Sequence, residues 1–351
     1  MRGKAEPFCL NGVRVAPGQR KTIELAIPEL YTHTNLGIPT QVMHGRRPGP
    51  RLFVCAAIHG DEINGVEIIR RLVNVRALER LHGTVIAVPV VNVYGFINQS
   101  RYLPDRRDLN RSFPGSDKGS LAARLAHVFL QQIAAVCTHG IDLHTGTIHR
   151  ENLAQIRANL SDPETARMAR AFPTPVMINT SLLEGSLRKA LADLGIPIIV
   201  YEAGEALRFD EIAIRAGVKG VIGVMRELGM LPQRRGLDPK IESLVASTSA
   251  WIRAPQSGIL RSTTGLGAKV EANQLLGIVS DPFGEREEEV RAPAAGVIVG
   301  RTNLPLVNEG EALYHLARFE SPGTAADTVE AFQFEYDPAT DQRVPEEPPI
   351  V

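Results

Sequence analysis

Cysteine is scarce in this chain of 351 residues, in which only Cys9, Cys55 and Cys137 occur, without paired spacing. This scarcity argues against a disulfide scaffold and against a zinc site built on thiolates, and it suits a reducing compartment. Long hydrophobic runs are also missing. No stretch approaches the ~20 apolar residues of a membrane span, and the first residues, "MRGKAEPFCLNG", do not have the apolar core of a signal peptide. We therefore expect a soluble, cytoplasmic protein that does not bind to membranes.

The chain also lacks an excess of charge of either sign. The 39 Lys and Arg residues balance 39 Asp and Glu residues, so no global attraction to nucleic acid or to an anionic membrane is expected. Hydrophobic residues make up 44% of the chain, which is ordinary for a globular protein. Because 351 residues exceed what one hydrophobic core usually holds, we expect one large domain and a smaller one.

Strand-like and helix-like segments alternate from about residue 50 to about residue 235. The runs "RLFVCAAI", "GTVIAVPVVN" and "IPIIVYEAG" are almost continuously apolar, as is typical of strands covered on both faces. Shorter strands with alternating polarity precede them, within residues 1–48. This pattern predicts an α/β fold, a three-layer α/β/α sandwich with a mixed, mostly parallel sheet, over residues 1–240.

The composition changes at "LPQRRGLDPK" (residues 231–240), a polar stretch with proline and glycine that we interpret as a linker. Residues 241–320 hold short strands, and the segments beginning "IRAPQSGIL" and "VRAPAAGVI" repeat one pattern. We predict an all-β domain here that resembles a biotinyl/lipoyl-type module and is a candidate cap for the active site. The absence of lysine from Glu271 to Glu320 argues against a carrier function and favours a structural or pocket-lining role. Residues 321–351 are acidic and rich in proline, which predicts a loosely held tail.

Two potential metal ligands follow the first of the buried strands. His59 and Glu62 in "IHGDE" form an H-x-x-E, and His144 in "IDLHTG" ends another strand. The carboxyl ends of parallel strands meet at one edge of an α/β sheet, where ligands bind. Two imidazoles and a carboxylate suit a catalytic zinc ion, which keeps one position open for water. We predict one zinc ion per chain; a polar turn between strand and helix is the alternative for the first two residues.

Two carboxylates accompany these ligands. Asp142, two residues before His144, can accept the second ring N–H of a ligand histidine, or can serve a strand-end turn instead. Glu202 in "IIVYEAGE" ends a further apolar strand, from where a carboxylate can take a proton from an attacking water and pass it to a leaving amine. A capping or ion-paired glutamate is the alternative. The loop "SRYLPDRRDLNRSFPG" adds Arg101, Asn110 and Arg111, which can bind a substrate carboxylate.

In this order, "HGDE", "DLNRSFPG", "DLH" and "EAGE" resemble the succinylglutamate desuccinylase/aspartoacylase family, a deacylase branch of the zinc carboxypeptidase superfamily. The resemblance covers about residues 50–320. It implies a carboxypeptidase-like sandwich, a zinc site and a glutamate that is both general base and general acid. The zinc ligands it implies are His59, Glu62 and His144, and the glutamate is Glu202.

The resemblance also implies roles in binding the substrate. Asn110 and Arg111 bind its carboxylate, and Arg101 in "SRY" polarises the scissile carbonyl, although two extra residues separate "SRY" from "DLNR" compared with the aspartoacylase pattern. Arg188 in "GSLRKALADLGIP" corresponds to a second arginine for a carboxylate. Tyr314 in "VNEGEALYHL" corresponds to a C-terminal tyrosine that reaches the pocket.

We expect a zinc-dependent amidohydrolase that removes an acyl group from a small N-acyl amino acid by means of a zinc-bound water activated by Glu202. A zinc carboxypeptidase for short or acidic peptide C-termini would use the same residues and is the first alternative. A non-catalytic binding protein on the same scaffold is the second. The sequence leaves the acyl group, the amino acid and self-association into a homo-oligomer open.

Overall fold

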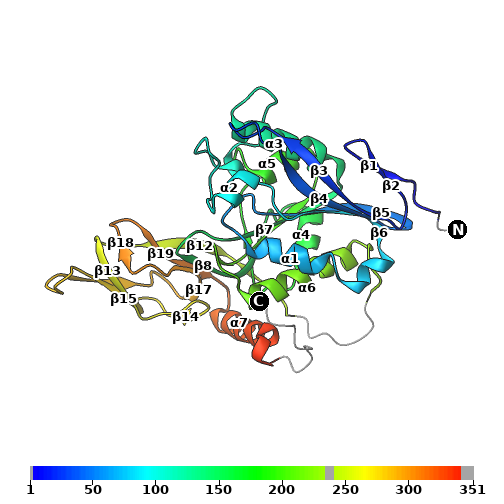
Figure 1. Cartoon of the computed structure of the whole chain (residues 1–351). Helices are drawn as coiled ribbons and strands as arrows, with labels where there is room; N and C mark the ends of the chain where they lie inside the picture. Colours follow the sequence, from blue (N-terminus) through cyan, green and yellow to red (C-terminus); the bar gives the residue numbers. More distant parts are fainter. Residues whose placement is uncertain (1–2, 234–240, 341–351) are drawn as a thin grey trace.

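The computed structural model describes residues 3–233 and 241–340 (Figure 1). Its centre is a mixed sheet of 13 strands with the main order β12-β19-β17-β8-β10-β7-β5-β6-β4-β3, while β9, β11 and β14 pair beside this path. The strands that begin in the first half of the chain are β3 (Arg20–Ile27), β4 (Leu36–His44), β5 (Arg47–Ala56), β6 (His82–Val88), β7 (His139–Gly146) and β8 (Arg150–Ala158). Those that follow are β9 (Val176–Asn179), β10 (Ile198–Glu205), β11 (Leu244–Ala246), β12 (Thr248–Arg253), β14 (Lys269–Val270), β17 (Gly296–Thr302) and β19 (Ala312–Arg318).

The sheet is mixed, as predicted, but "mostly parallel" holds only for its centre. The strands β6, β5, β7 and β10 are parallel neighbours, and β8, β9 and β11 form a second parallel group. Both ends of the sheet, beyond β6 and beyond β8, are antiparallel. The antiparallel flanks come from the N-terminal strands and from the C-terminal part of the chain, whose contribution to this sheet the sequence did not indicate.

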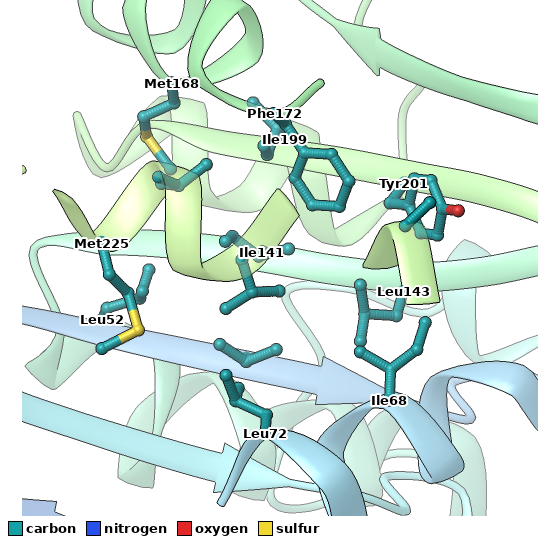
Figure 2. Packing of buried hydrophobic residues seen from close by; sticks show 14 of the residues in the cluster. Leu52, Ile68, Leu72, Ile141, Leu143, Met168, Phe172, Ile199, Tyr201 and Met225 are labelled. Carbon is teal, nitrogen blue, oxygen red and sulfur yellow. The ribbon is translucent and has the colours of Figure 1, made fainter. Parts of the chain in front are cut away.

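Both faces of the central strands are buried, which explains their continuous apolar runs. On β5, Leu52 and Val54 belong to one core cluster, and Phe53 and Cys55 belong to the cluster on the opposite face. The helices on the first face are α1 (Asn64–Leu72), α4 (Pro163–Ala171) and α6 (Glu211–Glu227), and those on the second are α2 (Val93–Ile97), α3 (Leu121–Gln132) and α5 (Leu187–Asp193). Figure 2 shows the first cluster, in which strand residues such as Ile141 meet side chains of these helices. Each large aliphatic side chain buried in this way contributes about 1.5–3 kcal/mol.

The C-terminal part is all-β up to residue 318, as predicted, but it is not separate from the main sheet. Strand β17 pairs antiparallel with β8, β19 pairs with β17, and β12 pairs with β19. The remaining strands form a second sheet of four, with its own apolar core: β13 (Gly258–Ser262), β15 (Leu275–Ser280), β16 (Glu287–Arg291) and β18 (Leu306–Val307). The likeness of this part to a biotinyl/lipoyl module stays a prediction.

The prediction of a loosely held tail is wrong for its first half. Pro322–Tyr336 form helix α7, which follows β19. Val329, Phe332 and Tyr336 are almost fully buried, and Lys219 of α6 forms an ion pair with Glu335. Residues 341–351 of the predicted tail, and most of the predicted linker at 231–240, lie outside the described residues.

The other elements are short. Strands β1 (Phe8–Leu10) and β2 (Val13–Val15) form a hairpin of their own, and the described residues also include four 3₁₀ turns. These turns are η1 (Arg76–Arg80), η2 (Leu109–Arg111), η3 (Ala134–Val136) and η4 (Pro338–Thr340). All three cysteines are free thiols. A search of the described helices found none with the length and apolar character that crossing a membrane requires.

Candidate metal centre and active site

The site lies where the central parallel strands end. The chain leaves β5 through Ala57, whose φ of 51° turns it sharply out of the sheet, and reaches α1 after the segment "HGDE". Gly60 is required within this segment, because a Cβ there would lie 2.0 Å from the backbone carbonyl carbon of Gly95 in α2. His144 lies near the end of β7 and is in register with Glu202 on the neighbouring parallel strand β10. Paired residues on neighbouring strands project to the same face of the sheet, about 4.8 Å apart.

The three predicted metal ligands lie together. Nδ1 of His59 is 2.7 Å from Glu62 Oε1, and Nδ1 of His144 is 2.7 Å from Glu62 Oε2. One donor atom from each of the three residues lies within 4.8 Å of the others, and all three side chains are buried. A buried group of two imidazoles and one carboxylate has the composition of a catalytic zinc site.

A carboxylate contacts the second ring nitrogen of each histidine. Nε2 of His144 donates to Asp142 at 2.8 Å, and Nε2 of His59 lies 3.2 Å from Asp108. Such carboxylates fix the tautomer and the ring orientation of metal-binding histidines, so that the other nitrogen can take a cation. Asp108 is missing from the sequence-based set, although it begins the "DLNR" motif.

The charges of the cluster also fit a divalent cation. Burial works against ionisation of Glu62, but His59 and His144 hold the pKa of this carboxyl well below its usual range. Burial likewise opposes protonation of His144, yet Asp142 and Glu62 raise the pKa of its imidazole well above the ordinary value. The negative charge around the imidazoles therefore attracts protons, and a metal ion bound at Nδ1 would replace them.

Arg101 lies against the same cluster. Its Nη2 donates to Asp108 at 2.8 Å, and its Nη1 is 3.4 Å from Glu62 Oε1 and 3.2 Å from His59 Nδ1. A positive group thus already contacts two of the ligand residues, in a side chain that is only 22% exposed. The structure therefore brings Arg101 to the ligand cluster, despite the two extra residues in its loop.

Two side chains of β8 hold the carboxylate of Glu202. Asn152 donates from Nδ2 to Oε2 at 2.7 Å, and Nε of Arg157 lies 3.6 Å from Oε1. Their spacing of five would put them on opposite faces of a regular strand, but the register between β8 and β10 shifts at Glu202 and Gly204. A bulge of this kind reverses the alternation, so both side chains reach the same face. The sequence offered no signal for this bulge, and both residues were missed.

A cavity of about 290 Å³ opens over these residues. Its volume is at the lower end of the range for small-molecule sites. The predicted residues that line it are His59, Glu62, Arg101, Asn110, Arg111, His144, Arg188 and Glu202. The others are Thr145, Gly146, Thr147, Arg150, Asn152, Arg157, Leu183, Ser186, Val200 and Trp251.

The substrate-binding candidates differ in how they are held. The side-chain oxygen of Asn110 accepts a hydrogen bond from the backbone N–H of Leu187, so Asn110 joins its loop to the start of α5. Arg111 donates to the carbonyl of Asn110, and Arg188 donates to the hydroxyl of Thr180 at 2.6 Å. Among the described residues neither arginine has a carboxylate partner, so both keep their charge available in the cavity.

Tyr314 does not reach the cavity, and its prediction as a substrate-binding residue needs correction. Its hydroxyl donates to the carbonyl of Leu276 at 2.8 Å and lies 2.7 Å from the hydroxyl of Ser262, inside the core of the four-stranded sheet. The next residue, His315, projects to the other face of β19 and stacks on Trp251 with ring centroids 4.8 Å apart. Because side chains alternate along β19, Tyr314 and His315 lie on opposite faces of this strand. The face of His315 is the one that carries Trp251 of the neighbouring β12, and Trp251, not Tyr314, lines the cavity.

Comparison with known families agrees with this geometry. The model of the succinylglutamate desuccinylase/aspartoacylase catalytic domain matches residues 48–228, just over half of the chain. The chain belongs to this family. The matched segment contains each of the three potential metal ligands, Glu202 and the loop that carries Arg101.

Three similar proteins extend the likeness to the C-terminal part. The N-alpha-acetyl-L-2,4-diaminobutyric acid deacetylase of Halomonas elongata is 26% identical over 292 residues, which are 80% of this chain and 85% of the relative. A succinylglutamate desuccinylase/aspartoacylase from Rhodobacter sphaeroides superposes with a TM-score of 0.76 at 22% identity, over 87% of this chain and 96% of its own. The product-bound ectoine utilization protein EutE (DoeB) of Ruegeria pomeroyi gives 0.75 at 24% identity, over 86% and 94%.

Proposed function

We propose that this protein is a zinc-dependent amidohydrolase that removes the acyl group from a small N-acyl amino acid. The observation that carries the proposal is the buried group of His59, Glu62 and His144 beside Glu202, at the floor of a small cavity. The deacetylase from Halomonas elongata, whose name describes removal of an acetyl group from an amino acid, supports the same reaction class.

The donor set favours zinc among the common metals. Two imidazole nitrogens and a carboxylate oxygen suit this borderline-soft ion, whereas calcium and magnesium prefer shells made of oxygen atoms alone. When bound, zinc lowers the pKa of water and polarises a carbonyl oxygen, which makes amide hydrolysis feasible at neutral pH. Asp108 and Asp142 orient the two histidines by accepting from their outer ring nitrogens.

Glu202 moves the protons of the reaction. It takes a proton from the attacking water and delivers it to the nitrogen of the departing amino acid. Asn152 holds one oxygen of Glu202 and Arg157 lies near the other, so the carboxylate keeps its orientation throughout. Arg101, whose Nη2 is bound to Asp108, donates from Nη1 to the oxygen of the scissile carbonyl and stabilises the negative charge that develops there.

The remaining cations fix the substrate. Arg111 and Arg188 bind the carboxylate of the amino acid, because both line the cavity with guanidinium groups that have no carboxylate partner among the described residues. Asn110 supports them by holding the start of α5. Binding at the carboxylate turns the amide bond toward Glu202, which converts binding energy into orientation.

A panel of substrates tests the proposal. Zinc-loaded protein should release free amine from at least one class of N-acetyl, N-formyl or N-succinyl amino acids, and a chelator should abolish the rate. Hydrolysis of peptides alone would place the protein among the carboxypeptidases, and absence of turnover on every substrate would favour a binding protein.

Glu202→Gln tests the assigned base in the same assay. This variant should bind one zinc ion per chain like the wild type and lose about 10²–10⁴-fold in rate. Glu79→Gln, a change of an exposed glutamate on η1, which does not line the cavity, is the matched control. Wild-type turnover by the Glu202 variant would refute the assignment.

A further inference from the structure

One wall of the cavity includes two residues that have no role in the reaction described above, Arg150 and Trp251, beside Arg157, which lies near Glu202. Arg150 lies at the start of β8, Arg157 lies further along β8, and Trp251 comes from β12 in the C-terminal part of the chain. Arg150 and Trp251 belong to other elements than the loop that carries Arg101 and Arg111 and than helix α5. We call these three residues the arginine–tryptophan wall.

Trp251 is held in place on this wall by two neighbours. Its ring stacks on the imidazole of His315 with an interplanar angle of 10° and a centroid distance of 4.8 Å. The guanidinium carbon of Arg150 lies over the indole at 5.5 Å. A cation placed over an indole in this way is attracted to the ring. The indole thereby orients Arg150. Among the described residues, the ion-pair partner of Arg150 is Glu311, whose oxygen lies 3.8 Å away, so this ion pair is weak.

Arg157 adds a second incompletely used cation. Its Nε is buried and makes no hydrogen bond among the described residues, and its distance of 3.6 Å from Glu202 is longer than a hydrogen bond. Positive charge is concentrated around it. Burial lowers the pKa of Arg188, and Arg157 and Arg111 lower it further by repulsion, while Glu202 and Asp142 act in the opposite direction. An anion in this part of the cavity would relieve that repulsion.

The acids of the cavity are already engaged. Among the described residues that line it, Glu62 and Glu202 are the acidic ones, and both belong to the reaction centre. No lining carboxylate therefore remains to bind an ammonium group of a substrate. The amino acid in the name of the Halomonas elongata relative, 2,4-diaminobutyric acid, carries a second amine, so the two proteins should differ in substrate.

We propose that the arginine–tryptophan wall is a subsite for a second carboxylate of the substrate, carried on the amino-acid side chain or at the end of the acyl chain. Arg150 and Arg157 donate to this carboxylate, and the indole of Trp251 packs against the methylene groups that lead to it. This inference rests on the proposed function, because it takes Arg111 and Arg188 to bind the first carboxylate. It makes Arg150 and Trp251 determinants of specificity, supplied in part by the C-terminal strands.

Binding can be measured directly because Trp251 is the single tryptophan of the chain. Its fluorescence would be titrated in chelator-treated wild type, which should not turn substrate over, and in zinc-loaded Glu202→Gln protein, in which turnover should be about 10²–10⁴-fold slower. N-acetyl-L-glutamate would be compared with N-acetyl-L-glutamine, and N-succinyl-L-alanine with N-butyryl-L-alanine. Each pair differs in one carboxylate, so the two pairs distinguish a side-chain carboxylate from an acyl-chain carboxylate.

At least one charged ligand should bind about tenfold or more tightly than its neutral partner, since a hydrogen bond to a charged group is strong. Arg150→Gln should abolish this preference and leave binding of the neutral partner unchanged, and Arg150→Lys should restore it in part. Arg14→Gln, a change of an exposed arginine on β2, is the matched control. Equal affinities within both pairs, or an unchanged preference in Arg150→Gln protein that melts like the wild type, would overturn the proposal.

Turnover measured in parallel separates this inference from the proposed function. A preference for the second carboxylate without any zinc-dependent hydrolysis would keep the subsite and reject the amidohydrolase. Hydrolysis with no preference between charged and neutral partners would keep the amidohydrolase and reject the subsite.

Discussion

The metal-ligand cluster and the arginine–tryptophan wall lie on one cavity but are built differently. In the cluster, both ring nitrogens of His59 and of His144 have carboxylate partners, and the side chains are no more than 5% exposed. On the wall, Arg150 is 33% exposed and Arg157 is 26% exposed, and their donors are incompletely used. The first arrangement suits a permanent cation in one geometry, and the second suits a group that arrives and leaves. The difference separates the chemistry of the site from its selectivity.

Removing one metal ligand should have the largest effect on activity. It would change the metal-ligand cluster but not the arginine–tryptophan wall. His144→Ala takes away one of three donors and removes one hydrogen-bond partner each from Asp142 and Glu62. We expect the zinc content to fall from about one ion per chain to near zero, and activity to disappear with it. Metal analysis after dialysis measures this, and His33→Ala, at a 92% exposed histidine, is the control. Retention of stoichiometric zinc would contradict the assigned ligands.

Asn152 lies between the two regions, so truncating it tests how sharply they are divided. Asn152→Ala frees one oxygen of Glu202 while the metal ligands stay intact. We expect a fall in kcat of up to about 100-fold, with KM and zinc content near the wild type, because the base loses its orientation and the substrate contacts remain. Steady-state kinetics against exposed Asn74→Ala measure this. A change in KM alone would show that Asn152 binds substrate instead.

The stability contributed by His315, which stacks on Trp251 of the arginine–tryptophan wall, should depend on pH. Burial, together with nearby Arg157, lowers the pKa of His315 to about 3, while an unfolded histidine titrates near 6.5. Between these values the unfolded chain binds a proton that the folded chain excludes. The stability that neutral His315 supplies is therefore complete above pH 6.5 and declines toward pH 3, by at most about 1.4 kcal/mol per pH unit.

The variant His315→Gln isolates this contribution. Its stability should fall less steeply than that of the wild type between pH 6.5 and pH 4.5, as measured by urea unfolding at several pH values. Parallel curves for the two proteins would show that His315 takes up a proton in the folded state.

Tyr314→Phe should have the smallest effect on activity. This result would show that Tyr314 is not part of the cavity wall formed by Arg150, Arg157 and Trp251. The hydroxyl group is bound inside the four-stranded sheet by Ser262 and Leu276. We expect stability to fall by about 1 kcal/mol and kcat/KM to stay unchanged. A large rise in KM would return Tyr314 to the substrate site.

The cluster could be predicted from the sequence because its residues follow apolar runs directly. Strand ends that share one sheet edge bring His59, His144 and Glu202 together without knowledge of any loop. Helix α7 could also have been predicted, since Ala325, Val329, Phe332 and Tyr336 repeat at helical spacing. The acidic and proline-rich residues beyond them obscured that pattern.

The wall and its neighbours could not be predicted in this way. Asn152 and Arg157 share a face only because of a bulge in the pairing of β8 with β10. Trp251 reaches the cavity through two strand pairings that join residues more than 60 positions apart, Trp251 with His315 and Gly300 with Asn152. Short-range patterns carry no information about such pairings.

The pairing of β17 with β8 has a consequence for how the chain can be divided. Strand β8 is paired with β10 on one side and with β9 and β17 on the other, so the C-terminal strands cover what would otherwise be an open stretch of edge at Arg150, Glu151 and Asn152. A fragment that stops before β12 would expose the backbone donors and acceptors of β8, which is a template for pairing with other copies. Such a fragment should aggregate before its activity could be assayed. The C-terminal strands thus protect solubility as well as shape the cavity, and the two halves have to be expressed, and inherited, as one unit.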